Sequence, residues 1–183
     1  MRLLAVGLCA LLSATPALAG IGKGNGEIGF DFGATDFDQN VSRQSAGRLT
    51  FRGGYHVSRL FEVEGDVSVS AHYNWDLQNT TRADVVLRTV FVNGVFNFHS
   101  KTGNVVPYVL AGFGSANLDY PFANVQDSGA AHQVGGGCRF FFGDRHGAAF
   151  RLQISRLTEK TFDETSNHMN WTAGFTWRLG AGT

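Results

Sequence analysis

Residues 169–179 read Met-Asn-Trp-Thr-Ala-Gly-Phe-Thr-Trp-Arg-Leu, and apolar side chains alternate with polar ones or glycine throughout. A period of two over this length predicts a β-strand with one apolar and one polar face. Trp171, Phe175 and Trp177 fall on the apolar face and Arg178 on the other. Aromatic side chains outside and a charged one inside are typical of a strand in a membrane barrel, where lipid covers the outer face.

Four positions of this strand also carry a resemblance. Thr172, Gly174, Trp177 and Leu179 are similar to the C-terminal signal by which outer-membrane barrels are recognised by the barrel-assembly machinery. Such chains usually stop at a terminal phenylalanine, whereas this one continues through residues 180–183. The resemblance implies that the barrel-assembly machinery is a partner during insertion.

The N-terminus has the pattern of a cleaved secretory signal peptide, residues 1–19. A basic Arg2 precedes an apolar run, and Ala17-Leu-Ala19 supplies the small residues of a cleavage site. The run is shorter than the ~20 residues that a spanning helix needs. We therefore expect one exported domain over residues 20–183. With 15 basic and 15 acidic residues the chain has no basic surplus that would suit nucleic acid.

Alternation continues along the rest of the chain and predicts eight strands. They cover about residues 26–34, 47–57, 60–73, 83–98, 105–118, 130–142, 148–157 and 170–179. Polar segments at 36–45, 74–82, 119–128 and 158–167 read as long loops, and the other connections read as short turns. An even number of strands with long loops on one side predicts an all-β, eight-stranded antiparallel up-and-down transmembrane barrel with periplasmic termini.

The fourth strand has an ambiguous phase. Leu87 and Phe91 alternate one way, whereas Val90, Val92 and Phe96 alternate the other way. A β-bulge that switches the phase part-way along the strand would explain both sets.

The whole pattern resembles the small eight-stranded outer-membrane barrels, a porin-family class that includes the transmembrane domain of outer-membrane protein A. The segment Pro107-Tyr108…Ala111-Gly-Phe-Gly114 and the closing strand carry this resemblance. It implies residence in a bacterial outer membrane as a monomer, with outer-membrane lipid and lipopolysaccharide as partners.

If the apolar faces meet lipid, five acids and five bases occupy a narrow lumen. They are Glu27, Asp31, Glu62, Glu64, Asp66, Arg48, Arg52, Arg139, Arg151 and Arg178. An eight-stranded barrel is only wide enough for its own side chains, and buried charges must be paired. We therefore expect a plugged polar core of arginine–carboxylate networks; a narrow gated channel through the same residues is the alternative.

Two other functions also fit parts of the sequence. His56-Val-Ser58 resembles the His-x-Ser arrangement of outer-membrane lipid A deacylases, which would make the protein a lipid A-modifying hydrolase. A soluble lipocalin-type barrel would need its apolar faces inward. The histidines have no close metal-ligand spacing, so we expect no metal, cofactor or catalytic residue. The favoured interpretation is a non-enzymatic barrel with a structural role or a surface-interaction role through its loops.

Overall fold

The computed structural model describes residues 26–39, 41–42, 44–72, 85–98, 104–121, 123–142 and 147–179. Within these ranges the chain forms eight strands. They are β1 (Gly26–Asp36), β2 (Ser45–His56), β3 (Phe61–Ala71), β4 (Val86–Asn97), β5 (Val105–Tyr120), β6 (Val125–Phe142), β7 (Ala148–Thr161) and β8 (Glu164–Leu179). The predicted signal peptide and the predicted loop at 74–82 lie outside the described residues.

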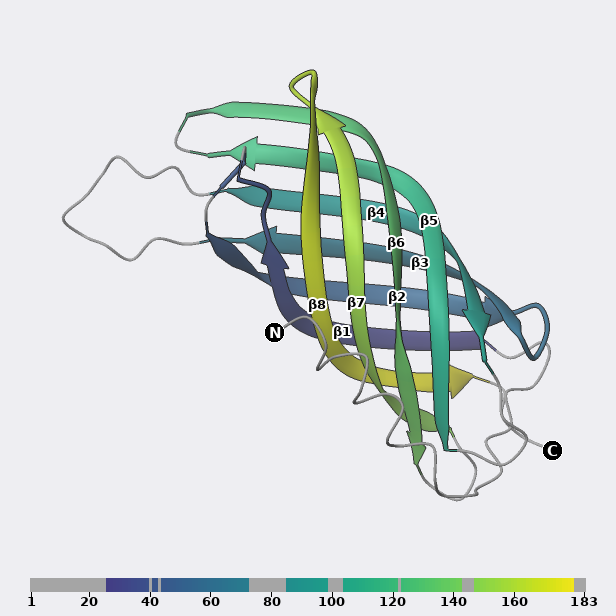
Figure 1. The fold of residues 1–183 in the computed structure, drawn as a ribbon. Coiled ribbons are helices and arrows are strands. Elements are labelled where there is room, and N and C mark those ends of the chain that lie inside the picture. The colour runs from purple at the N-terminus through teal and green to yellow at the C-terminus, as the bar shows by residue number, and fades with distance from the viewer. Residues whose placement is uncertain are drawn as a thin grey trace.

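The strands close into a barrel in sequence order, and every neighbouring pair is antiparallel (Figure 1). The ring closes where β1 pairs with β8 over eleven positions, from Gly26 opposite Leu179 to Asp36 opposite Met169. We call the end at Gly26 and Leu179 the proximal end and the opposite end the distal end. The predicted eight-stranded antiparallel barrel is confirmed. No helix among the described residues is long and apolar enough to cross a membrane.

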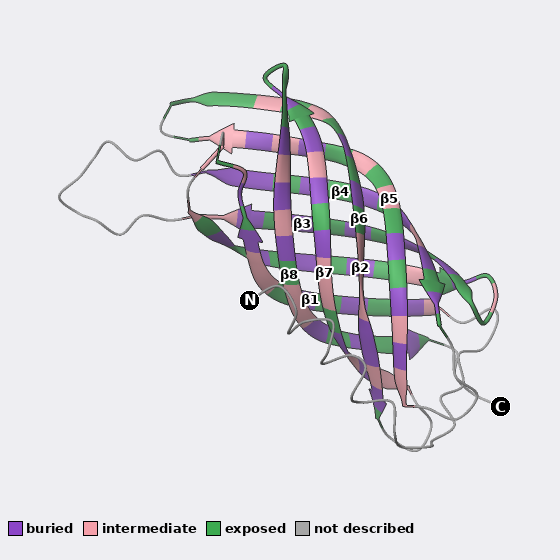
Figure 2. Cartoon of the chain, in the orientation of Figure 1, coloured by how far each residue is buried: buried purple, intermediate pink, exposed green. Residues whose placement is uncertain are grey.

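Burial alternates along each strand, as the stripes in Figure 2 show. The outward positions form an apolar belt, defined here on four strands by residues 90–98, 105–113, 134–142 and 171–179. Nine residues on each strand is the length that a tilted strand needs to cross the hydrocarbon core, ~9–11 residues. On β4, β5 and β6 the next outward positions on the distal side are polar, Arg88, Ser115 and His132, whereas on β8 the next is Met169.

Two of the four predicted long loops are wrong. The segment 119–128 is mostly strand, because β5 runs to Tyr120 and β6 begins at Val125. The segment 158–167 is also strand except for Phe162 and Asp163, whose φ values of 50° and 60° form a tight two-residue turn. Such turns match the twist of a hairpin but usually contain glycine or asparagine. Because the turn at Phe162 and Asp163 contains neither glycine nor asparagine, the polar ends of the two flanking strands were predicted to be a loop.

These extended hairpins make the barrel asymmetric. The four strands β5 to β8 have 16, 18, 14 and 16 residues, whereas β1 to β4 have 11 or 12. Since the belt takes about nine of them, the second half of the chain continues past its distal edge. We call this projecting part of β5 to β8 the distal wall (Figure 1).

The predicted bulge in β4 is wrong. Its register against β3 and β5 is continuous, so the strand keeps one phase from Val86 to Asn97. Val90 and Val92 face outward, whereas Leu87 and Phe91 are buried inside the barrel. The apolar residues of both phases are therefore accommodated because part of the barrel interior is apolar.

Candidate functional site

All ten charged residues predicted for the lumen lie in the barrel interior. None is more than 9% exposed, and they come from β1, β2, β3, β6, β7 and β8. Strand alternation places them there, because each occupies the face opposite the apolar belt. Several of them meet in two adjoining clusters near the proximal end.

The first cluster surrounds the guanidinium of Arg139. Its Nη2 lies 2.8 Å from Glu62 Oε2 and 3.4 Å from Glu27 Oε1, and Nη1 donates to Asn97 Oδ1 at 3.2 Å. The His56 ring lies beside the same two carboxylates, with Nε2 3.3 Å from Glu27 and Nδ1 3.7 Å from Glu62. One arginine therefore balances two acids contributed by different strands.

The second cluster is organised by Arg151. Its guanidinium binds both carboxylate oxygens of Glu64, which is the paired geometry that gives arginine its strongest contacts. Nε donates to the Tyr108 hydroxyl at 2.6 Å, and Nη2 donates to Gln153 Oε1 at 2.5 Å. The Tyr108 ring also lies under Arg151 and Arg139, at 4.5 and 5.1 Å from ring centroid to guanidinium. Sequence reasoning missed this tyrosine because the inward phase of β5 is otherwise apolar.

Arg52 joins the second cluster to β1 and β8. It forms an ion pair with Asp31, lies 3.7 Å from Glu64 and donates to Thr176 Oγ1 at 3.0 Å. The Arg52 side chain occupies space above Gly29, where an added Cβ would approach its Nε to 2.7 Å. Glycine at this inward position therefore makes room for a guanidinium.

Arg48 and Asp66 depart from the predicted arginine–carboxylate pairing. Arg48 donates to hydroxyls, at 2.5 Å to Ser68 and 3.2 Å to Ser70. Asp66 instead accepts from amides, at 2.6 Å from Asn93 and 3.0 Å from Gln133. Neutral partners suffice here because a buried charge needs hydrogen bonds as much as a counterion. Arg178, nearer the proximal end, lies over the Phe141 ring at 4.3 Å.

Little space remains among these side chains. The cavity lined by Asp31, Arg52, Glu64 and their neighbours has a volume of about 10 Å³. A water molecule needs ~10–15 Å³, so this space is at the lower limit for one water.

Three of the interior residues could also hold a cation. The ligand atoms of Glu27, His56 and Glu62 lie within 4.8 Å of one another. Sequence spacing did not bring them together, since they belong to three different strands. The Arg139 guanidinium already lies against both carboxylates and supplies the positive charge that a metal would bring.

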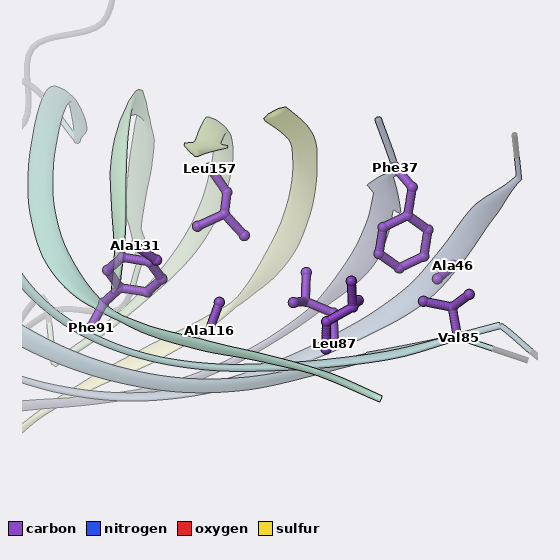
Figure 3. Close-up of a cluster of buried hydrophobic side chains, with 9 residues drawn as sticks. Phe37, Ala46, Val85, Leu87, Phe91, Ala116, Ala131 and Leu157 are labelled. Atoms are coloured by element: carbon purple, nitrogen blue, oxygen red, sulfur yellow. The ribbon is translucent and has the colours of Figure 1, made fainter. Parts of the chain in front are cut away.

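The distal part of the interior is apolar, which sequence reasoning did not predict. Figure 3 shows the buried apolar side chains of this part, which come from the segments just after β1 and just before β4 and from β2, β4, β5, β6 and β7. The cluster consists of Phe37, Ala46, Val85, Leu87, Phe91, Ala116, Leu118, Ala131 and Leu157. Several belong to the distal wall, so the inner surface of the wall packs against residues that follow β1. The lumen is thus polar near the proximal end, whereas at the distal end an apolar cluster lies beside buried polar residues such as Glu159 and His168.

The connection after β1 is fastened to the edge of β8. The backbone N–H of Asp38 donates to His168 Nδ1 at 3.1 Å, and the Asp38 carboxylate accepts from the backbone N–H of Asn167 at 2.9 Å. Because Nδ1 accepts, a neutral ring carries its proton on Nε2, which lies 3.4 Å from Glu159. Phe37 packs edge-on against the same ring at 5.4 Å. These contacts cover β8 where β1 has ended.

The residues of the hydrolase alternative do not form a nucleophile–base pair. His56 is fully buried between Glu27 and Glu62. Ser58 lies in the turn after β2, where its Oγ accepts from the backbone N–H groups of Leu60 and Phe61 at 3.2 and 3.0 Å. The hydroxyl therefore stabilises the turn.

The four residues of the predicted assembly signal lie in the proximal half of β8. Trp177 and Leu179 are exposed on the belt, at 48% and 52%. Gly174 faces the interior, where an added Cβ would overlap the carbonyl oxygen of Phe30 and the carboxylate of Asp31. This glycine allows β8 to lie close to β1, which is a structural reason for its presence besides any recognition.

An apolar belt of membrane-crossing length around a charged interior defines the class of an eight-stranded transmembrane barrel. The family model described as "Outer membrane protein beta-barrel domain" matches residues 5–178, and the chain belongs to that family. No curated protein has a significantly similar sequence.

Solved structures share the fold at low sequence identity. Neisserial surface protein A (NspA) has a TM-score of 0.68 at 13% identity, over 86% of this chain and all of that one. OprG of Pseudomonas aeruginosa has 0.58 at 13%, over 88% of this chain and 99% of that one. Ail of Yersinia pestis, the attachment invasion locus protein, has 0.55 at 16%, over 86% and 99%. These similarities confirm the small outer-membrane barrel architecture.

Proposed function

We propose that the protein is a non-enzymatic outer-membrane barrel whose interior is plugged, with a structural role or a surface-interaction role in the envelope. The observation that carries this proposal is the filled interior: ten charged side chains are buried there, and the cavity beside five of them, Asp31, Arg48, Arg52, Glu64 and Asp66, has a volume of about 10 Å³. The apolar cluster at the distal end adds a second obstruction to water and ions. In this proposal the proximal end faces the periplasm and the distal wall faces the outside.

Conductance tests the plugged interior. The purified barrel, inserted into a planar lipid bilayer, should give no steady current at moderate voltage. The double variant Leu87→Ala with Phe91→Ala removes side chains from the distal obstruction but leaves every ion pair in place; it too should stay silent, because the charged layer remains. Steady unitary currents from the wild-type protein would instead establish the narrow gated channel.

The distal wall is the surface available for an interaction role, since it projects past the belt. Among the structural neighbours, Ail has been solved in complex with the heparin analogue sucrose octasulfate, at 17% identity and a TM-score of 0.53. On the wall of this chain, Arg156 and Lys160 are exposed outward positions on β7. The surface role that we propose for this protein is therefore adhesion through the distal wall.

Adhesion of intact cells to a heparin-coated surface tests the interaction role. Cells that express the protein should adhere, and a double variant Arg156→Gln with Lys160→Gln should not, because heparin is anionic and these are exposed outward cations of β7. A matched Arg59→Gln variant alters a cation at the proximal end and should adhere normally. Equal adhesion by the double variant would reject these cations of the wall as the interacting surface.

A further inference from the structure

We propose that the outer surface of β1 to β4 binds one molecule of lipopolysaccharide, with a lipid A phosphate on Arg88 and an acyl chain in a groove beside it. This inference rests on the proposed function, because it takes the distal end as the outer-leaflet side. The groove has a volume of about 260 Å³ and is lined by Phe30, Leu49, Phe51, Val67, Val69 and Arg88. Its occupant must therefore be apolar along its length and anionic at one end.

The groove has walls and a floor of its own. Phe30 and Phe51, adjacent in the β1–β2 ladder, stand 45% and 59% exposed on the outer surface. Val67 and Val69 on β3 are shorter side chains and leave a hollow between these rings and β4. An acyl chain in such a hollow makes dispersion contacts on several sides. On a flat aliphatic surface it would make them on one side only.

Arg88 lies at the distal edge of the belt beside the groove, where the lipid A phosphate would bind. It is the first charged outward residue distal to the belt on β4. Its ion pair with Asp119 is long, at 3.5 Å, and its side chain remains 57% exposed. Arginine binds phosphate through paired N–H donors, and at the edge of hydrocarbon this contact is weakly screened.

The strand register shows how such a lipid would lie, with its phosphate at Arg88 and its acyl chain along a row of paired outward residues. Arg88 pairs with Val69, Val69 with Leu49, and Leu49 with Phe32. The distal edge of the belt is Val90 on β4 and Phe113 on β5, and Phe113 pairs with Val92. A row of paired residues therefore rises toward the distal end from β4 to β5 and descends in the opposite direction, from β4 to β1. The row therefore descends from the polar edge into the belt. Because the strands are tilted, a lipid with its phosphate at Arg88 would run its chain down this row.

Native mass spectrometry with added lipid A measures the binding. The wild-type barrel in mild detergent should retain one lipid A, and dephosphorylated lipid A should bind about tenfold more weakly. Arg88→Gln should lose a similar factor, and Val67→Trp should weaken binding by filling the groove. Asp119→Asn removes the competing carboxylate and should tighten binding. Arg156→Gln and Val92→Trp are matched controls outside the groove and should bind like the wild type.

Three outcomes would overturn the site. They are unchanged binding by Arg88→Gln, an equal loss with Arg156→Gln, or binding of phosphatidylglycerol as tight as that of lipid A. Each variant is first checked for the heat-dependent shift in electrophoretic mobility of a folded barrel. If Arg88→Gln does not fold, Asp119→Asn and Val67→Trp decide the question, and wild-type affinity in both would reject the site. Absence of the mobility shift in the wild-type protein would contradict the proposed outer-membrane barrel. A mobility shift without lipid A binding would contradict only this lipid site.

Discussion

The Tyr108 hydroxyl accepts a 2.6 Å hydrogen bond from Arg151 Nε and donates one of 3.0 Å to Gln153 Oε1. The hydroxyl oxygen therefore joins the guanidinium of Arg151 to the neutral side chain of Gln153, and both of these residues lie on β7. Its ring meanwhile lies against the guanidinium groups of both Arg151 and Arg139, at 4.5 and 5.1 Å from the ring centroid. Tyr108 therefore orders the interior without contributing a charge to it.

Replacement of this hydroxyl tests that role. Tyr108→Phe keeps the ring but leaves Arg151 Nε without its acceptor, and we expect the free energy of unfolding to fall by about 1.5–3 kcal/mol, the range for hydrogen bonds to charged groups. Denaturant titration of the detergent-solubilised barrel measures it. Tyr55→Phe changes an exposed tyrosine of the outer surface and should cost little. Equal stability of the two variants would contradict the role.

Removal of the shared guanidinium should cost more. Arg139→Met leaves Glu27 and Glu62 facing each other without their common counterion, and breaking a buried pair in this way costs about 3–5 kcal/mol. A second change, Glu62→Gln, removes one of the two stranded charges and should restore part of the loss. If the double variant is no more stable than the single one, the two acids are not coupled through Arg139. Titration with denaturant again gives the comparison.

Phe91 and Val90 are neighbours on β4 with opposite environments, and they form a matched pair. Phe91→Ala opens a cavity in the distal apolar cluster and should destabilise the barrel by about 3–5 kcal/mol. Val90→Ala exposes no cavity, because lipid or detergent fills the space, and should cost less than about 1 kcal/mol. Similar losses from both variants would show that the distal interior is loosely packed.

The contact between Asp38 and the β8 edge can be followed at one amide. In Asp38→Ala the backbone N–H of Asn167 loses its carboxylate acceptor, and its hydrogen exchange should become about tenfold faster, in line with ~1–3 kcal/mol for an unsatisfied group. NMR of the deuterated protein in micelles resolves that amide. The amide of Phe30, in the middle of β1, should keep its rate. An unchanged rate at Asn167 would mean that the connection is not held by this carboxylate.

Gly174→Ala separates assembly from structure. The added Cβ would press on β1 at Phe30 and Asp31, so the variant should refold poorly into lipid vesicles even without assembly machinery. Gly47→Ala is the control, since nothing lies within 4 Å of a Cβ placed there. The fraction that shows the heat-dependent mobility shift measures folding. Normal refolding of Gly174→Ala in vesicles, with failure only in cells, would favour recognition of this glycine by the machinery.

Alternation along the sequence was sufficient to predict the eight strands and to assign Glu62, Glu64 and Asp66 to the interior. It could not identify the partners of each charge, because Glu27, Glu62 and Arg139 come from three strands and meet only through the closed register. Alternation also failed at the far ends of the distal-wall strands, where polar residues occupy both faces. A strand such as residues 125–130 then lacks the contrast on which a period of two depends.

The apolar cluster escaped prediction for a related reason. Leu87 and Phe91 share a strand with outward Val90 and Val92, so apolar residues occur on both faces of β4. Only the paired strands decide which side is inside. A bulge was the simplest local explanation, but the unbroken register shows that the interior itself changes character along the barrel axis.

The eleven-position ladder between β1 and β8 also constrains how the protein is made. Those two strands are at opposite ends of the polypeptide, so every intermediate that lacks β8 has two open edges, and lipid offers no hydrogen bonds to exposed backbone groups. Insertion strand by strand would therefore be costly. During biogenesis the polypeptide must travel from synthesis to membrane without stable structure, and its commitment to the bilayer coincides with the arrival of the last strand rather than the first.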